Sequence, residues 1–204
     1  TWEYNTGVLY VGNAGWIDAT SLPSGNNNIT ILASHEVTLT QNETINTGAT
    51  ITVNGVFNTS TFALQGAGNL TLANGGTLKI RNLHATDAYA AAVGITGAVT
   101  LATGSTVELN GAGQQFLGAN TFSGLTINNA SGVKATGNIT VNGILNLASA
   151  NPNATDGALD MVIAYGTYAT VSKTEPDNFN STLEHNNLNS YVLNLGAAAT
   201  VTGI

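Results

Sequence analysis

Four titratable residues lie close together in the middle of the chain: Lys79, Arg81, His84 and Asp87. Lys79 and Arg81 share one face of a predicted strand because side chains alternate along it, and His84 and Asp87 follow on a loop. Polysaccharide-cleaving sites combine carboxylates with a base in this way. Such a site also needs facing acidic residues, and the neighbouring segments supply only Glu108. We therefore expect a solvated patch at the base of a loop, no catalytic residues and no enzyme.

Aromatic residues gather near the N-terminus, where both tryptophans of the chain lie. Trp2, Tyr4, Tyr10 and Trp16 are candidates for a platform on which sugar rings stack, because exposed aromatic side chains mark binding sites. The alternative is that they seal one end of a hydrophobic core. The sequence leaves both interpretations open.

Other charged residues indicate polar surface. One group lies in a segment near the C-terminus: Lys173, Glu175, Asp177, Glu184 and His185. Asp156 and Asp160 do not have the spacing of a known calcium loop. The chain has no cysteine, which excludes disulfides, thiolate zinc sites and cysteine nucleophiles. We expect no metal site and no cofactor.

The composition limits the classes of partner. Charged residues make up only 7% of the 204 residues, with four basic residues and a net charge of −7. Nucleic acids and anionic membranes need clustered cations, so neither is an expected partner. No apolar run reaches about 18 residues, so no membrane insertion is predicted. The chain starts without Met, and we expect a mature, processed or excised fragment.

A short unit of apolar residue, Thr and apolar residue recurs along the chain. It starts at the following residues: Ile29, Val37, Ile51, Leu70, Val99, Leu125 and Ile139. In a strand this unit turns two aliphatic side chains inward and the Thr outward. The composition of short alternating apolar runs with Gly at their ends predicts an all-β protein.

Longer repeats set the spacing of these strands. LTLANGGTLKI at Leu70 is matched by VTLATGSTVEL at Val99, and ITVNG occurs at Ile51 and again at Ile139. The predicted repeat steps run from Ile29 to Ile51, to Leu70, to Val99 and to Leu125. Steps of this size, roughly 20–30 residues, are typical of the coils of β-solenoids.

The fold that these features predict is a right-handed parallel β-helix, that is, a β-solenoid, in a single domain. Residues 1–28 are expected to form an aromatic N-terminal cap, residues 29–160 the coils, residues 161–190 an insertion and residues 191–204 the final strands. A β-sandwich is the alternative, since it also uses many short strands.

The segments LTINNASGVKATGNITVNGILNLASA (125–150) and SGNNNITILASHEVTLTQNETINTGATITVNG (24–55) carry a family resemblance. The chain resembles, over residues 24–150 and 191–204, adhesin-like right-handed parallel β-helix regions of surface proteins that Bacteroidetes-type bacteria export by type IX secretion. The resemblance implies an extracellular or bacterial cell-surface location and transfers no catalytic residue. Residues 161–190 do not belong to the family's repeat, and no C-terminal sorting domain is recognised.

The sequence predicts a non-catalytic structural or adhesive module that acts as a surface stalk, layer or filament subunit. Low charge leaves little repulsion between copies, so self-association, end to end or side by side, is expected. Surface glycans are the alternative partner, and the alternative functions are a carbohydrate-binding module or a polysaccharide-active enzyme. Rows of outward Thr can also bind ice, but loops of different length interrupt the Thr spacing here, so we do not expect a flat two-dimensional array.

Overall fold

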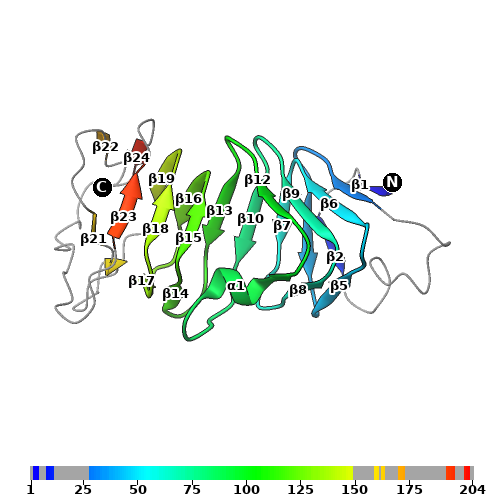
Figure 1. Cartoon of the computed structure of the whole chain (residues 1–204), viewed down its shortest axis with the longest axis horizontal. Helices are drawn as coiled ribbons and strands as arrows, with labels where there is room; N and C mark the ends of the chain where they lie inside the picture. The colour runs from blue at the N-terminus through cyan, green and yellow to red at the C-terminus, as the bar shows by residue number, and fades with distance from the viewer. Residues whose placement is uncertain are drawn as a thin grey trace. The chain divides into compact units, whose positions relative to one another are not determined.

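The protein is represented by a computed structural model in which residues 28–148 are described without a gap. Seven further strands are described by themselves: residues 2–4, 8–11, 159–160, 162–163, 170–172, 192–195 and 200–202. The chain divides into two compact units. Figure 1 labels the helix and the strands along the chain. Unit 1 comprises Thr1–Asn82 and Ala90–Thr106, and unit 2 comprises Leu83–Tyr89 and Val107–Ile204.

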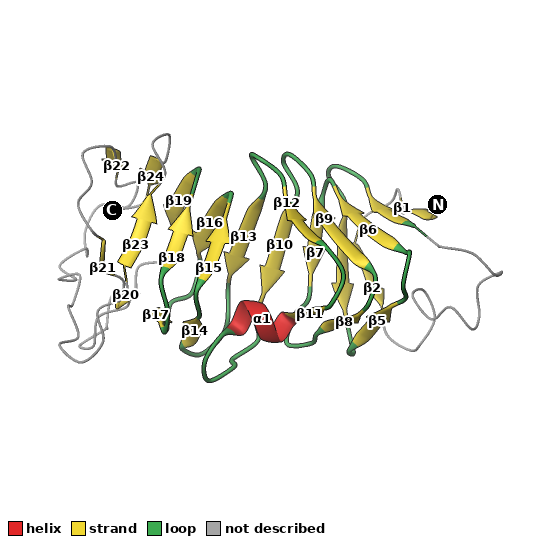
Figure 2. Ribbon diagram, viewed as in Figure 1, coloured by secondary structure: helices red, strands yellow, loops and turns green. Residues whose placement is uncertain are grey.

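Unit 1 consists of short strands that stack in three sheets (Figure 2). The first sheet has the order β1 (Trp2–Tyr4), β3 (Ile29–Ile31), β6 (Thr50–Val53), β9 (Asn69–Leu72) and β12 (Val99–Leu101). The second has the order β2 (Val8–Val11), β4 (Glu36–Leu39), β7 (Val56–Asn58) and β10 (Thr77–Ile80). The third has the order β5 (Glu43–Ile45), β8 (Leu64–Gly66) and β11 (Val93–Ile95).

Unit 2 repeats this plan. One sheet has the order β14 (Gln115–Leu117), β17 (Val133–Ala135) and β20 (Leu159–Asp160). Another has the order β15 (Asn120–Phe122), β18 (Ile139–Val141), β23 (Val192–Leu195) and β21 (Val162–Ile163). The remaining strands follow the order β16 (Gly124–Ile127), β19 (Ile144–Leu147), β24 (Thr200–Thr202) and β22 (Thr170–Ser172). A short helix, α1 (Ala88–Ala92), and β13 (Thr106–Leu109) span the points where the chain passes between units.

The strand pairing identifies the fold. Within unit 1, β3 pairs with β6, β6 with β9 and β9 with β12, and all three pairs are parallel. Within unit 2, β15 pairs with β18 and β16 with β19, again in parallel. Successive coils therefore stack on one another, as in a β-solenoid, which is consistent with the predicted right-handed parallel β-helix. The alternative of a β-sandwich, built from antiparallel strands, is wrong.

The register confirms three of the four predicted repeat steps. Ile29 is opposite Ile51, Ile51 opposite Leu70, and Leu70 opposite Val99. The step from Val99 to Leu125 is wrong, because Leu125 lies in β16 and is paired with Leu145 of β19. The apolar–Thr–apolar pattern occurs in strands of more than one sheet, so it does not reveal which side of a coil a strand forms.

Alternation along the strands builds the core. Ile51, Val53, Leu70 and Leu72 are fully buried, while the threonines between them are partly exposed. Each aliphatic side chain stacks on its register partner, and burying one fully contributes about 1.5–3 kcal/mol. Val99 departs from the pattern because it is 37% exposed.

The repeated phrase ITVNG forms the same corner in each unit. Asn54 N donates to Ile31 O at 2.8 Å in unit 1, and Asn142 N donates to Phe122 O at 2.9 Å in unit 2. A Cβ atom at Gly55 would lie 2.2 Å from the carbonyl oxygen of Leu32, which is too close for any side chain. Glycine is required here because the backbone of the preceding coil approaches so closely.

Asparagines at strand entrances tie consecutive coils together. The Oδ1 atom of Asn28 accepts a hydrogen bond from Thr50 N at 3.0 Å, and that of Asn69 accepts one from Ala98 N at 2.8 Å. Asn42 Oδ1 likewise accepts from Ala63 N at 2.9 Å. These side chains satisfy backbone donors of the next coil, which lie where the sheet hydrogen-bond ladder is interrupted.

Candidate functional site

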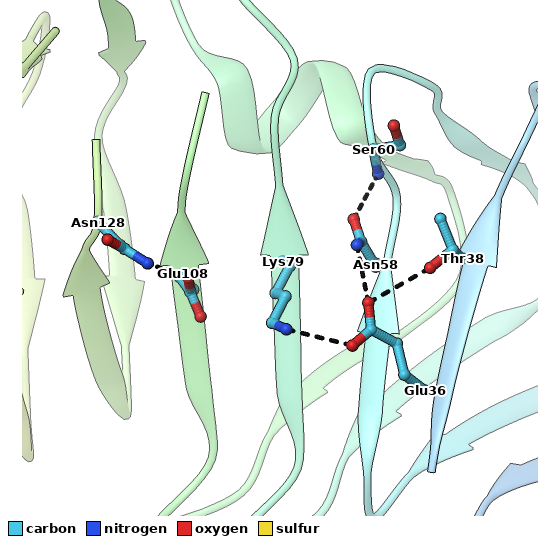
Figure 3. A network of polar contacts seen from close by, with 7 residues as sticks. All are labelled: Glu36, Thr38, Asn58, Ser60, Lys79, Glu108 and Asn128. Carbon is cyan, nitrogen blue, oxygen red and sulfur yellow. Dashed lines mark hydrogen bonds and ion pairs between the residues drawn. The ribbon is translucent and has the colours of Figure 1, made fainter. Parts of the chain in front are cut away.

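A polar network of unit 1 surrounds Glu36 (Figure 3). Its Oε1 atom accepts hydrogen bonds from Asn58 Nδ2 at 2.9 Å and from Thr38 Oγ1 at 3.3 Å. Its Oε2 atom lies 3.2 Å from Lys79 Nζ. Asn58 in turn accepts the backbone N–H of Ser60 at 2.9 Å through its Oδ1 atom. Three consecutive strands, β4, β7 and β10, thus contribute to one network.

The surroundings of Glu36 favour its charged form. Partial burial by itself raises the pKa of the carboxyl. Hydrogen bonds from Asn58, Lys79 and Thr38, together with the positive charge of Lys79, outweigh that effect, so the pKa lies below its ordinary value. A general acid needs a raised pKa, so this carboxylate is suited to holding neighbouring strands together.

The four residues considered above as a possible catalytic group have separate local roles. Lys79 pairs with Glu36 in unit 1, and Arg81 is exposed there. His84 and Asp87 belong to unit 2. The Nδ1 atom of His84 lies within hydrogen-bond distance of Thr86 N at 3.4 Å and of Asp87 N at 3.3 Å, so the ring is used to shape the loop.

Asp87 holds the loop of residues 83–89 onto unit 2. Its Oδ1 atom accepts from Tyr89 N at 2.9 Å, and its Oδ2 atom accepts from Asn120 Nδ2 of β15 at 2.9 Å. The Tyr89 ring packs edge-to-face on Phe122 with centroids 5.3 Å apart. Burial, with a smaller contribution from the charge of Asp87, raises the pKa of Tyr89 to about 12. These contacts fasten a loop, and none leaves a carboxylate and a base facing a common substrate position.

Within the described residues, no group of three His, Asp or Glu side chains is arranged to hold a metal ion. None of the helices in this part of the chain is long and apolar enough to cross a membrane.

A column of threonines runs along the first sheet of unit 1, at the outward positions of the predicted apolar–Thr–apolar units. Thr30 is opposite Thr52, Thr52 opposite Thr71, and Thr71 opposite Thr100. This column continues from β3 to β12 although the coils between these strands differ in length. The expectation that the chain lacks a flat array of several such columns stays a prediction. The side chains are partly or fully exposed, so their hydroxyl groups face solvent at the spacing of the strands, about 4.8 Å.

The structure describes the backbone of three of the four residues of the predicted aromatic platform. Trp2 and Tyr4 lie in β1, opposite Ile29 and Ile31. Tyr10 lies in β2, opposite Thr38, whereas Trp16 lies outside the described residues. The glycan platform stays a prediction.

Comparisons with known proteins found no match among protein-family models, curated proteins or solved structures.

Proposed function

We propose that this chain is a non-catalytic structural or adhesive β-solenoid module of an extracellular or bacterial cell-surface protein, a stiff part of a stalk, layer or filament. The observation that carries the proposal is the unbroken register of the first sheet. Four consecutive strands, β3, β6, β9 and β12, stay in step although the coils between them differ in length.

This register supports a mechanical role for a physical reason. Each coil shares its hydrogen bonds and its aliphatic column with the coils on either side, so bending or opening one coil disturbs its neighbours. The Lys79–Glu36 pair, which joins β10 to β4 across the intervening β7, adds a link between coils that are not adjacent. A stack cross-linked in this way resists deformation better than independent loops do.

The surface chemistry supports close association between copies. Only 7% of the residues are charged, and the exposed positions of the strands are mainly Thr and Asn. Little electrostatic repulsion opposes packing of one such surface on another. Self-association, end to end or side by side, is the assembly mode that we expect.

Electron microscopy of the purified chain over a concentration series tests the proposal. Ordered filaments or sheets at high concentration are the expected result. Discrete particles at every concentration, with no ordered assembly, would count against a structural role. Glycan binding would then be the function to test.

The threonine column favours adhesion to an insoluble polysaccharide as a second candidate function. Hydroxyl groups both donate and accept hydrogen bonds, and a regular row of them suits a polymer surface with repeating hydroxyls. Pull-down with cellulose and chitin particles tests this idea with the variant Thr52→Val/Thr71→Val, which keeps side-chain shape and removes two hydroxyls. Matched replacement of Thr121 and Thr140, which are opposite each other in unit 2, is the control.

Binding by the intact chain that falls at least tenfold in the Thr52/Thr71 variant, with little change in the control, is the expected result. Equal binding by all three chains would exclude the threonine column as the polysaccharide-binding surface. In that case Trp16→Ala tests the aromatic platform in the same assay. Polysaccharide cleavage that is abolished by Arg81→Ala would instead indicate an enzyme.

A further inference from the structure

The last coil of unit 2 is interrupted in the sequence. β20 pairs with β17 through Leu159 and Val133. β23 pairs with β18, and β24 pairs with β19, although residues 161–191 separate β20 from β23 in the sequence. Strands β20, β23 and β24 together therefore complete the coil that follows β17, β18 and β19.

Two strands from the intervening segment pair with this coil on its other side. β21 pairs with β23, where Ile163 is opposite Leu193, and β22 pairs with β24, where Val171 is opposite Val201. Among the described strands, β21 and β22 are the last in their sheets (Figure 1). A segment that leaves the coil part-way thus returns to cover two of the coil's three strands.

The covering strands have the sequence pattern of a coil. β22 is Thr-Val-Ser and is in register with Thr-Val-Thr of β24. β21 is Val-Ile and is in register with Val192 and Leu193 of β23. In sequence and in register, β21 and β22 take the places of the strands of one further coil, but the edge that they present is shorter, because β21 has two residues where β23 has four. Very short edge strands pair poorly with strands of another chain.

We propose that β21 and β22 form a built-in end cap that hinders a second copy of this chain from stacking its own β1 and β2 on β23 and β24, so that end-to-end growth of the intact chain needs a higher concentration. The inference rests on the structural function proposed above and names the edge at which end-to-end growth is controlled. Uncovered strand edges pair readily with other strands. Stacking of this kind joins two different surfaces, and such a head-to-tail contact builds a filament when the rotation between copies does not close a ring.

The first two strands of the chain fit the role of partner. β1 and β2 are parallel to the strands beside them, and each is the first described strand of its sheet, next to β3 and β4 respectively. A copy that presents β1 and β2 to uncovered β23 and β24 offers two strands to two strands. Within one chain, β21 and β22 already pair with the same two strands, β23 and β24.

A deletion of residues 161–188 removes the cap and keeps the coil. It leaves residues 189–191 as the corner between β20 and β23. The corner between β17 and β18 has the same length, residues 136–138. Should the deletion impair folding, Val171→Pro in the intact chain weakens the pairing of β22 instead, because proline cannot donate a hydrogen bond.

Sedimentation velocity and electron microscopy of both chains over a concentration series give the test, after circular dichroism has confirmed a folded β protein. We expect the deletion variant to form linear oligomers at a concentration at least tenfold lower than the intact chain. A small proportion of intact chain added to the variant should shorten these oligomers, since it can join through β1 and β2 but then presents a capped end.

The remaining outcomes separate the cap from the proposed function. If both chains assemble at the same concentration, the cap proposal is overturned and the structural function remains supported. If the folded variants and the intact chain all stay monomeric, both proposals fail. If the intact chain does not shorten the oligomers of the variant, the edge named here is not the one that grows.

Discussion

Lys79 and Glu36 form an ion pair of 3.2 Å between Nζ and Oε2, although the strands that carry them, β10 and β4, are separated by β7. The pair is diagonal, because Lys79 is in register with Asn58 and Thr38, whereas Glu36 is in register with Val56. Asn58, on the intervening strand, donates to the same carboxylate. The network therefore links three coils at one point on the surface of unit 1.

The first prediction concerns the pH dependence of this network. The pKa of Glu36 is lowered in the folded state, so the network stabilises the fold above the pKa of an unfolded glutamate, about 4.3, and loses that effect as pH falls through the folded pKa. Both side chains are partly exposed, at 27% for Lys79 and 23% for Glu36, so the stabilisation should be about 1 kcal/mol or less.

Urea unfolding of Glu36→Gln against the original chain at pH 7 and pH 3 measures it. The original chain should have the larger free energy of unfolding at pH 7, and the difference between the two chains should disappear at pH 3. Glu108→Gln is the control at pH 7, since this carboxylate accepts one hydrogen bond from Asn128 at 2.8 Å, and we expect a smaller loss. If the difference in free energy of unfolding is the same at pH 3 as at pH 7, the charged form of Glu36 does not stabilise the fold.

The second prediction concerns the glycine corners. Gly55→Ala places a Cβ atom 2.2 Å from Leu32 O and 2.4 Å from His35 O, which are backbone atoms that cannot yield cheaply. We expect a loss of more than about 2 kcal/mol in thermal or urea unfolding. Gly94→Ala is the matched control, because its nearest neighbour is the Gln65 Cγ atom at 3.5 Å. Equal effects of the two changes would mean that close coil approach does not determine the need for glycine.

The third prediction concerns the loop of residues 83–89. Asp87→Ala removes the acceptor of both Asn120 Nδ2 and Tyr89 N, so it should destabilise unit 2 by about 1–3 kcal/mol. A double-mutant cycle with Asn120→Ala isolates the side-chain pair, and we expect a coupling energy of at least about 0.5 kcal/mol. Additive effects of the two single changes would show that the hydrogen bond contributes nothing to stability.

Periodicity in the sequence was enough to predict the strands and much of their register. Inward and outward positions follow from the alternation around Thr52 and Thr71, and the unequal repeat steps from Ile29 to Val99 match the observed pairing of β3, β6, β9 and β12. The pattern could not distinguish the sheets, so Leu125 was matched to the wrong strand. It also did not predict that Thr38 is buried, with 9% exposure and its hydroxyl donating to Glu36 Oε1.

The contacts of the candidate site depend on distances along the chain that no local pattern encodes. Glu36 and Lys79 are 43 residues apart, and they meet only because two particular coil lengths add up correctly. Asp87 and Asn120 are 33 residues apart, and their contact requires a loop to fold back onto β15. Grouping Lys79 with Asp87 by nearness in sequence therefore predicted a patch whose members have separate partners.

Native-state hydrogen exchange of Leu72→Asp tests most directly whether the coils support one another. Leu72 is fully buried in β9 and is opposite Val53 of β6 and Leu101 of β12. A charge at this position destabilises its own coil strongly, because an unpaired buried charge is costly. We predict that amide protection is lost in β6 and β12 together with β9. Loss of protection confined to β9, with β6 and β12 unchanged, would contradict the claim that the stack acts as one mechanical element.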